Sequence, residues 1–266
     1  MFNRNILIRV GIMIKKYRLE LEVANNNLKP SPSWAYLLYA TMIENIKTEY
    51  VEYLHEDGLN PINQYVHIPD RNCPNKIEWN INLLGNEAIS QVEPFLMKIE
   101  NIRLKKFDTD ITVTNRVITC TTTEADILNT YLTTGNAFKN MRIDFLSATS
   151  FKSNEKYVLF PSVDLILKSA VSKWNAFSSS YALDDEEALQ QMIDRTRIYQ
   201  YALRSNSFML KQARIPGFRG YIKLYSTGPD PMVRLINLLF GFLEYSGVGI
   251  KTTLGMGGCK VTLEGE

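Results

Sequence analysis

Near its carboxyl end the chain reads GVGIKTTLGMGGCKVTL, from Gly247 to Leu263, and this stretch decides between the fold classes open to it. A Walker A phosphate loop requires glycine directly before Lys-Ser/Thr, whereas here Ile250 precedes Lys251 and Thr252. The stretch also follows an apolar helical run and enters a strand pattern. Phosphate loops of the P-loop and Rossmann folds run from strand to helix. Both nucleotide-binding folds are therefore excluded by spacing and direction.

The same glycines fit another pattern, in which two Gly-apolar-Gly triplets are separated by five residues. The first triplet contains Gly247 and Gly249, and the second contains Gly255 and Gly257. Glycine allows positive φ and close approach of another chain, so exposed backbone N–H groups could meet phosphate oxygens while Lys251 adds positive charge. A tight connector that packs against its own sheet would explain the loop equally well.

Outward from this loop, the second half of the chain alternates helix and strand patterns. Pro231 can occupy the first turn of a helix that runs through MVRLINLLFGFLEYSG. Further helices are predicted over residues 163–177 and 186–195. Strands are predicted over MRIDFLSATSF, RIYQYAL, SFMLKQARI, FRGYIKLYS and MGGCKVTLE.

The first half shows a similar order of elements. Residues 12–23 alternate apolar and charged side chains, which indicates a strand with one buried face. Ser33 is a predicted N-cap for one helix through WAYLLYATMIENIKTEYVEYL, and a loop with Gly58, Pro61 and Pro69 follows. A strand is then predicted over KIEWNINLL, a helix over residues 86–99, and strands over ENIRLKKF and TDITVTNRVITC.

This order of elements predicts an α+β protein with two tandem ferredoxin-like (RRM-like) domains. Each domain is expected to be an antiparallel sheet with helices on one face. We place the boundary in the threonine run near Thr123, so that the domains span residues 1–123 and 124–266.

Composition excludes several functional classes. The net charge of +2 gives no general argument for nucleic-acid binding, which would need a local basic surface. Three widely spaced cysteines without a CxxC pair predict a reduced, cytoplasmic protein. With two histidines and no ligand cluster, we expect no metal site and no cofactor. No apolar run reaches 18 residues, so we expect no membrane span.

Several stretches resemble one protein family. In order along the chain they are YLHE around His55, RIDFLSATSFKSNEKYVLFPSVDLILKSAVSKWN from Arg142, GFRGYIKLY from Gly217, and the glycine-rich loop. Together they resemble the Cas6 endoribonucleases among the CRISPR-associated RAMP proteins. Because the matches touch both halves in the expected order, they are stronger than the loop alone.

The resemblance implies an activity. A Cas6 protein is expected to cut the CRISPR repeat within precursor RNA without a metal and to give mature guide RNAs. In this reaction the ribose 2′-OH attacks the adjacent phosphorus and leaves a 2′,3′-cyclic phosphate and a 5′-OH. The expected partners are precursor and mature guide RNA, other Cas proteins of an effector complex, and a second copy of the chain. The alternative is a non-catalytic RNA-binding RAMP subunit of an interference complex.

His55 matches the family's histidine near the end of the first helix, and it is our candidate for proton transfer. An imidazole titrates near neutral pH, so it could accept the 2′-OH proton or protonate the leaving 5′-oxygen. The residues leave this choice open. A histidine at a helix C-terminus can also simply hydrogen-bond the last carbonyls.

The resemblance further implies a tyrosine from the first helix and a lysine shortly after the histidine. Tyr36 and Tyr39 are the candidate tyrosines, although helix aromatics often serve only as core. The lysine is missing, because no Lys or Arg occurs between Lys47 and Arg71. This absence keeps the non-catalytic alternative open.

Other basic residues could stabilise the phosphate or hold RNA. His67, in QYVHIPD, is the rival histidine, to be considered if His55 is dispensable. Phosphate stabilisation could come from Lys47, Arg71, Lys251 or a basic residue of the first strand. The candidate RNA-binding residues share a basic side chain on a strand, hairpin or loop, or belong to the glycine-rich stretch: Lys15, Lys16, Arg18, Lys211, Arg214, Arg219, Lys223, Lys251, Gly247, Gly249, Gly255 and Gly257.

Overall fold

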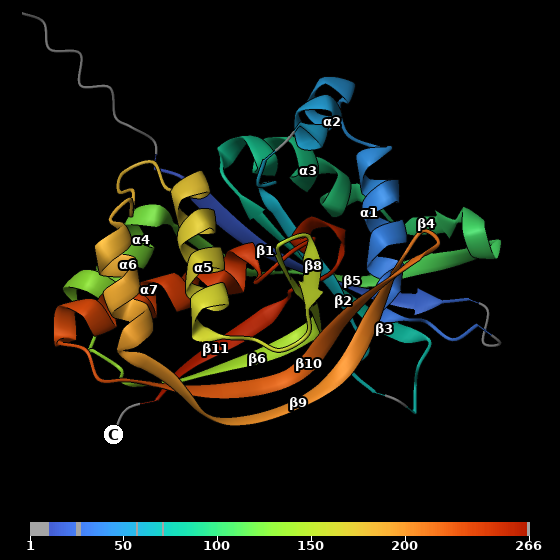
Figure 1. The fold of residues 1–266 in the computed structure, drawn as a ribbon. Coiled ribbons are helices and arrows are strands. Elements are labelled where there is room, and N and C mark those ends of the chain that lie inside the picture. Colours follow the sequence, from blue (N-terminus) through green and yellow to red (C-terminus); the bar gives the residue numbers. More distant parts are fainter. Residues whose placement is uncertain (1–10, 25–27, 57, 71, 265–266) are drawn as a thin grey trace, which may run out of the picture.

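The computed structural model describes residues 11–24, 28–56, 58–70 and 72–264, and it contains two antiparallel sheets that carry helices (Figure 1). The chain is therefore an α+β protein, as predicted.

The first sheet has five strands in the order β2-β3-β1-β5-β4. Its neighbouring strands are antiparallel throughout. Its elements, in chain order, are β1 (Met13–Val23), η1 (Pro32–Trp34), α1 (Ala35–Ile43), α2 (Thr48–His55), β2 (Ile62–His67), β3 (Lys76–Leu84), α3 (Asn86–Lys98), β4 (Asn101–Leu104), η2 (Lys105–Phe107) and β5 (Thr109–Thr123).

The second sheet has four strands in the order β11-β6-β10-β9 and is also antiparallel. The elements of this half are α4 (Glu124–Leu128), η3 (Asn129–Thr133), β6 (Asn140–Thr149), β7 (Phe151–Ser153), β8 (Lys156–Val158), α5 (Val163–Phe177), α6 (Glu186–Asp194), β9 (Thr196–Leu210), β10 (Ala213–Ser226), α7 (Asp230–Ser246), η4 (Thr252–Leu254) and β11 (Cys259–Glu264).

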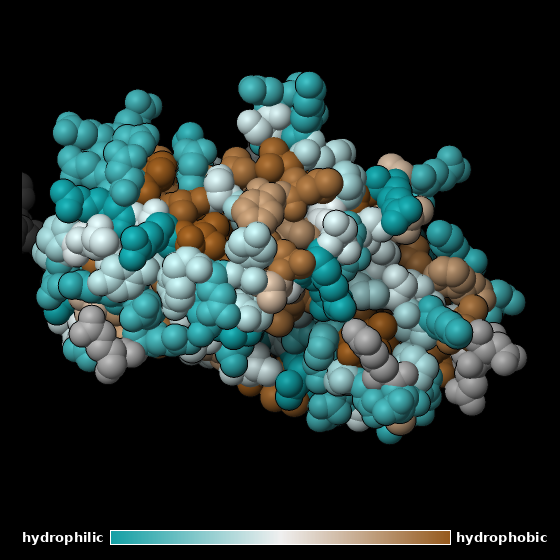
Figure 2. Space-filling view, turned by 60° about the horizontal axis from the view of Figure 1, so that its bottom comes forward, coloured by the Kyte–Doolittle hydropathy of each residue, from teal (hydrophilic) through white to brown (hydrophobic). Residues whose placement is uncertain are grey.

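Each half has its own apolar core, and each core takes residues from the other half. The core around α1 and α3 includes Phe208 and Met256 from the second half. The core around α5 and α7 includes Ile14 and Leu84 from the first half. A space-filling view shows apolar residues gathered in groups among hydrophilic ones, so the surface is not uniformly polar (Figure 2). The two sheets are thus joined by shared burial of apolar side chains.

The prediction of a single helix after Ser33 is wrong. The segment forms η1, α1 and α2, with a turn between the two α-helices. Ser31, rather than Ser33, caps the start, since its Oγ accepts from the backbone N–H of Ser33. At the end of α1 the Asn45 amide donates to the Thr41 carbonyl at 2.8 Å, and Lys47 then adopts extended dihedrals. Polar side chains that satisfy terminal backbone groups end a helix in this way.

Two strand predictions also need correction. RIYQYAL and SFMLKQARI do not form separate strands; β9 is continuous to Leu210, and the hairpin turns at Lys211 and Gln212. The region predicted as a loop with Gly58, Pro61 and Pro69 contains strand β2. Its buried amides, Asn63 and Gln64, hide the apolar alternation that marks a strand.

Among the described residues, no helix is long and apolar enough to cross a membrane.

Candidate functional site

A cavity of about 1040 Å³ lies where the two halves of the chain meet. Four segments that are far apart in sequence contribute to it: α1, the end of α2 with the residues after it, the β9–β10 turn and the glycine-rich loop. Its lining residues are Tyr36, Tyr39, Ala40, Ile43, Leu54, His55, Gly58, Leu59, Asn60, Leu210, Lys211, Gln212, Ala213, Gly249, Ile250, Lys251, Thr252, Thr253 and Leu254.

His55 is the last residue of α2, and its side chain is exposed at this cavity. In the described part of the chain the imidazole has no recorded hydrogen-bond partner, so it does not cap the helix. Asn60 takes that role, because its amide donates to the Leu54 carbonyl at 3.0 Å. The Asn60 carbonyl oxygen in turn accepts from the Ile62 N–H at 3.2 Å. The helix end is thus fixed while His55 is left free to meet a ligand.

The two candidate tyrosines differ in environment although both line the cavity. Tyr39 is buried, with 5% of its surface exposed, and it is hydrogen-bonded to Asn60. Burial raises the pKa of Tyr39 to about 12, so its hydroxyl keeps its proton at neutral pH. Tyr36 is half-buried and packs against the core of the first half. Asn60, which stands where the family's lysine was expected, connects Tyr39 to the end of α2.

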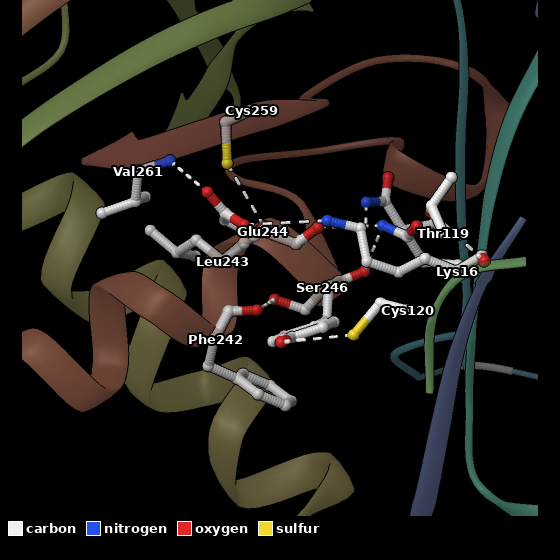
Figure 3. A network of polar contacts seen from close by, with 12 residues as sticks. Lys16, Thr119, Cys120, Phe242, Leu243, Glu244, Ser246, Cys259 and Val261 are labelled. Carbon is white, nitrogen blue, oxygen red and sulfur yellow. Dashed lines mark hydrogen bonds and ion pairs between the residues drawn. The ribbon is translucent and has the colours of Figure 1, made fainter. Parts of the chain in front are cut away.

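The glycine-rich loop is anchored through the last turn of α7. Figure 3 shows side chains from β1, β5 and β11 converging on this turn. The Asn82 amide donates to the carbonyls of Glu244 and Tyr245 at 2.9 and 3.0 Å, and the Asn63 amide also donates to Tyr245. The Cys259 thiol donates to the Leu243 carbonyl at 3.2 Å. Carbonyls at a helix C-terminus lack intrahelical partners, so these contacts fix the point where the loop begins.

The α7 side chain of Glu244 is part of the same anchor. Its carboxylate accepts from the Val261 N–H at 2.6 Å and lies 3.7 Å from the Lys16 ammonium. Burial raises the pKa of the Cys259 thiol to about 12, so it acts as a neutral donor.

The loop uses its glycines for close packing. Gly249 has φ of 75°, and a Cβ there would lie 2.3 Å from the Ser150 carbonyl oxygen. Gly257 has φ of 70°, and its Cβ would lie 2.1 Å from the Val248 carbonyl oxygen. Gly247, Gly255 and Gly257 are buried, so they could affect RNA only by shaping the loop.

The part of the loop that faces the cavity runs from Gly249 to Leu254. Lys251 is exposed in the left-handed region at φ of 55° and precedes the short helix η4. Within the described residues, the backbone N–H groups of Lys251, Thr252 and Thr253 donate no hydrogen bond to another part of the protein. Successive free N–H groups beside a lysine form an arrangement suited to an anion.

Some of the predicted basic residues line the cavity and others do not. Lys211, at the β9–β10 turn, and Lys251 line the cavity with His55. Lys15, Lys16 and Arg18 do not line it, and each lies near a partly exposed carboxylate of the first or second half. Their partners are Glu93 at 2.7 Å, Glu244 at 3.7 Å and Glu78 at 4.0 Å, respectively.

Three further basic candidates, Arg214, Arg219 and Lys223, lie on the second sheet and do not line the cavity. The Arg214 guanidinium donates to the Ser207 hydroxyl at 2.9 Å, and that of Arg219 donates to the Leu146 carbonyl. Lys223 pairs in register with Arg142 on β6. Lys47 is at the N-terminus of α2, and Arg71 lies outside the described residues.

His67 sits on β2, where its Nδ1 lies 3.2 Å from a Glu78 carboxylate oxygen. It does not line the cavity that holds His55. The two histidines therefore occupy separate sites, and only His55 shares one with the glycine-rich loop.

Helix α5 contributes residues that the sequence patterns did not single out. Lys173 is 3% exposed and donates to the carbonyls of Ser246 and Gly247 at 3.2 and 2.7 Å. Burial lowers the pKa of Lys173 to about 7. Ser169, one turn earlier, accepts from the Gly249 N–H at 3.0 Å. The available signal was a lysine between Ala170 and Trp174 on the apolar face of a helix.

Among the described residues, no group of three or more His, Cys, Asp or Glu side chains is arranged to hold a metal ion.

Comparison with known proteins gives a consistent family relationship. The model of the family described as CRISPR-associated endoribonuclease Cas6 matches residues 143–259. A CRISPR-associated endoribonuclease Cas6 of Streptococcus thermophilus is 28% identical over 232 residues, which is 87% of this chain and 93% of the relative.

Solved structures share the fold. A product complex of Cas6 (TTHB231), a Thermus thermophilus protein, has a TM-score of 0.78 and 19% identity, and the alignment covers 94% of this chain and 99% of that one. The chain of a partial Cas6-RT-Cas1–Cas2 complex has a TM-score of 0.60 and 13% identity, with 96% of this chain and 46% of that one covered.

Proposed function

We propose that this chain, a member of the Cas6 family of CRISPR-associated endoribonucleases, cleaves CRISPR repeats in precursor RNA at the cavity containing His55. The observation that carries this proposal is the meeting of His55 with Lys211 and Lys251 at one cavity. The first half of the chain supplies the imidazole of His55. The second half supplies the positive charge, because the sequence around His55 contains no lysine or arginine.

The proposed reaction uses the RNA's own nucleophile. The 2′-OH attacks the adjacent phosphorus, the bond to the 5′-oxygen breaks, and a 2′,3′-cyclic phosphate and a 5′-OH result. His55 transfers a proton, either from the 2′-OH or to the leaving oxygen. Lys251 and the free N–H groups of residues 251–253 stabilise charge on the phosphate, and Lys211 adds positive charge at the same cavity.

The sheet orders support the finer fold prediction. Without the extra edge strand β4, the first sheet has the order β5-β1-β3-β2, so its last strand lies beside its first, followed by its third and its second. The second sheet, β11-β6-β10-β9, has the same order of last, first, third and second strands. We accordingly propose two ferredoxin-like domains divided near Thr123, where β5 ends.

We propose precursor and mature CRISPR RNA as partners, because one structural neighbour is a Cas6 product complex. The neighbour in a Cas6-RT-Cas1–Cas2 complex supports assembly with other Cas proteins. A homodimer and a cytoplasmic location stay predictions; the three free cysteines agree with the second.

The test is single-turnover cleavage of end-labelled repeat RNA in EDTA by the wild type, His55→Ala and His67→Ala. We expect the wild type and His67→Ala to cleave with similar rates. His55→Ala should lose at least about 10²-fold in rate, because a positioned proton-transfer group contributes about 10²–10⁴-fold. Binding should change little, since His55 is one contact among several.

Three outcomes would contradict the proposal. Loss of cleavage in His67→Ala with His55→Ala intact would move the site to β2. Loss of wild-type cleavage in EDTA would contradict metal independence, and cleavage of RNA with a 2′-deoxyribose at the cut would contradict the nucleophile. Wild-type binding without cutting would instead support the non-catalytic RNA-binding subunit.

A further inference from the structure

We infer that Ser169 and Lys173, one turn apart on α5, are positioning residues that hold the glycine-rich loop in its working conformation without touching RNA. The inference rests on the proposed function for its consequence in cleavage, but its structural part can be tested without RNA.

The two side chains hold the loop at both ends of its first Gly-apolar-Gly triplet. The Lys173 ammonium donates to the Gly247 carbonyl at 2.7 Å and to the Ser246 carbonyl at 3.2 Å. The Ser169 hydroxyl accepts from the Gly249 N–H at 3.0 Å. Residues four apart lie on one face of a helix, so a single helix face fixes both glycines.

These contacts matter because both glycines have positive φ. Gly247 has φ of 72° and Gly249 has φ of 75°. Glycine adopts positive and negative φ about equally readily, so hydrogen bonds from outside the loop are needed to favour this conformation. The triplet is followed directly by Ile250 and Lys251, which line the cavity with His55. The dihedrals at the triplet therefore set where residues 251–253 point.

Lys173 contacts the backbone of the loop from the protein interior. Its side chain is 3% exposed, so it cannot pair with a phosphate on the surface. It lines a smaller cavity of about 360 Å³, and Gly249 and Ile250 line both this cavity and the His55 cavity. The same helix carries exposed neighbours at this smaller cavity, Lys168 and Ser172, which give matched controls.

The first experiment follows hydrogen exchange of the free protein by mass spectrometry over a peptide spanning residues 244–258. We expect Lys173→Met and Ser169→Ala to exchange about fivefold faster there, since each removes hydrogen bonds that resist opening. Lys168→Met and Ser172→Ala should match the wild type. Equal exchange in all four variants would overturn the inference, and so would an equal rise over β6 and β10, which would show a general folding role.

The second experiment measures repeat-RNA binding and single-turnover cleavage at saturating RNA. We expect Lys173→Met to lose about 10²-fold in cleavage, because misplacement of a positioning element by about 1 Å can cost that much. The slope of log affinity against log salt should stay unchanged, whereas Lys251→Met should lower it by about 1.

The two experiments separate the inference from the proposed function. A slope lowered by about 1 in Lys173→Met would show a direct phosphate contact and overturn the positioning role. If the wild type fails to cleave any repeat RNA, the proposed function fails while the exchange result still decides the inference.

Discussion

Gly249→Ala is expected to damage cleavage much more than folding. The new Cβ would lie 2.3 Å from the Ser150 carbonyl oxygen, and atoms of this kind rarely approach within 3.0 Å, so the loop must move by about 0.7 Å or more. Alanine at φ of 75° adds strain of about 1–2 kcal/mol. Together with overpacking, the cost at fixed backbone is about 2–5 kcal/mol.

The loop can relieve much of this cost by moving away from Ser150. That movement would stretch two hydrogen bonds, from the Ile250 N–H to the Ser150 carbonyl at 3.0 Å and from the Gly249 N–H to Ser169 at 3.0 Å. The segment that faces His55 would shift with it. A shift approaching 1 Å can reduce the rate about 10²-fold, although the fold itself survives.

The assay combines thermal unfolding with single-turnover cleavage of labelled repeat RNA. We expect the melting temperature of Gly249→Ala to fall by about 4–10 °C and the cleavage rate at saturating RNA to fall about 10²-fold. Gly11→Ala is the matched control, because a Cβ there meets nothing within 4 Å and should change neither quantity. If Gly249→Ala cleaves at the wild-type rate at a temperature where it is folded, the loop does not position the reacting phosphate.

Two further predictions concern titratable groups. Burial acts to raise the pKa of Glu124, but hydrogen bonds from Ser178, Ser180 and Ser179 outweigh it and lower the pKa to about 2. The stability gained from this ionised carboxylate is present above pH 4.5 and is lost as the pH falls toward 2. Denaturant titrations should therefore show that the free energy of unfolding of the wild type exceeds that of Glu124→Gln by less at pH 3 than at pH 6. A difference that is the same at both pH values would contradict this. Because burial raises the pKa of Tyr39 to about 12, Tyr39→Phe should lower the cleavage rate without changing the shape of the rate profile from pH 6 to pH 9, and an altered alkaline limb would show that Tyr39 ionises during the reaction.

Local patterns predicted the elements that bury an apolar face. Strand β3 and helix α5 begin and end at the predicted residues, because alternation and helical spacing are set by the residues themselves. Two of the failures, the single helix after Ser33 and the missed strand β2, involve polar side chains that hydrogen-bond to the backbone. The Asn45 amide bonds to the last turn of α1, where the helix ends. On β2, the buried amides of Asn63 and Gln64 interrupt the alternation of apolar and polar residues by which a strand is predicted. The contacts of Asn63 and Gln64 depend on partners that only the fold brings near, whereas the contact of Asn45 is local.

The site was predicted in pieces. His55, Tyr39 and the glycine-rich loop were identified from short stretches, whereas their common cavity could not be read from a chain in which about 190 residues separate them. Lys15 and Lys16 show the opposite case. They look like a basic strand in sequence, but neighbouring strand residues point to opposite faces, and their ammonium groups lie near Glu93 and Glu244 respectively.

The net charge of +2 hides the local electrostatics that matter for an RNA backbone. The described residues lining the His55 cavity include Lys211 and Lys251 and no Asp or Glu. Clefts lined by one sign of charge focus the field and raise the local concentration of an oppositely charged ligand. On the proposed mechanism, the lysine that the family resemblance led us to expect after His55 is replaced by charge of the same sign that reaches the cavity from the hairpin and the loop. On the same mechanism, cleavage depends on the exposed imidazole from the first half of the chain and on the conformation of the glycine-rich loop from the second half, which presents Lys251 to the cavity.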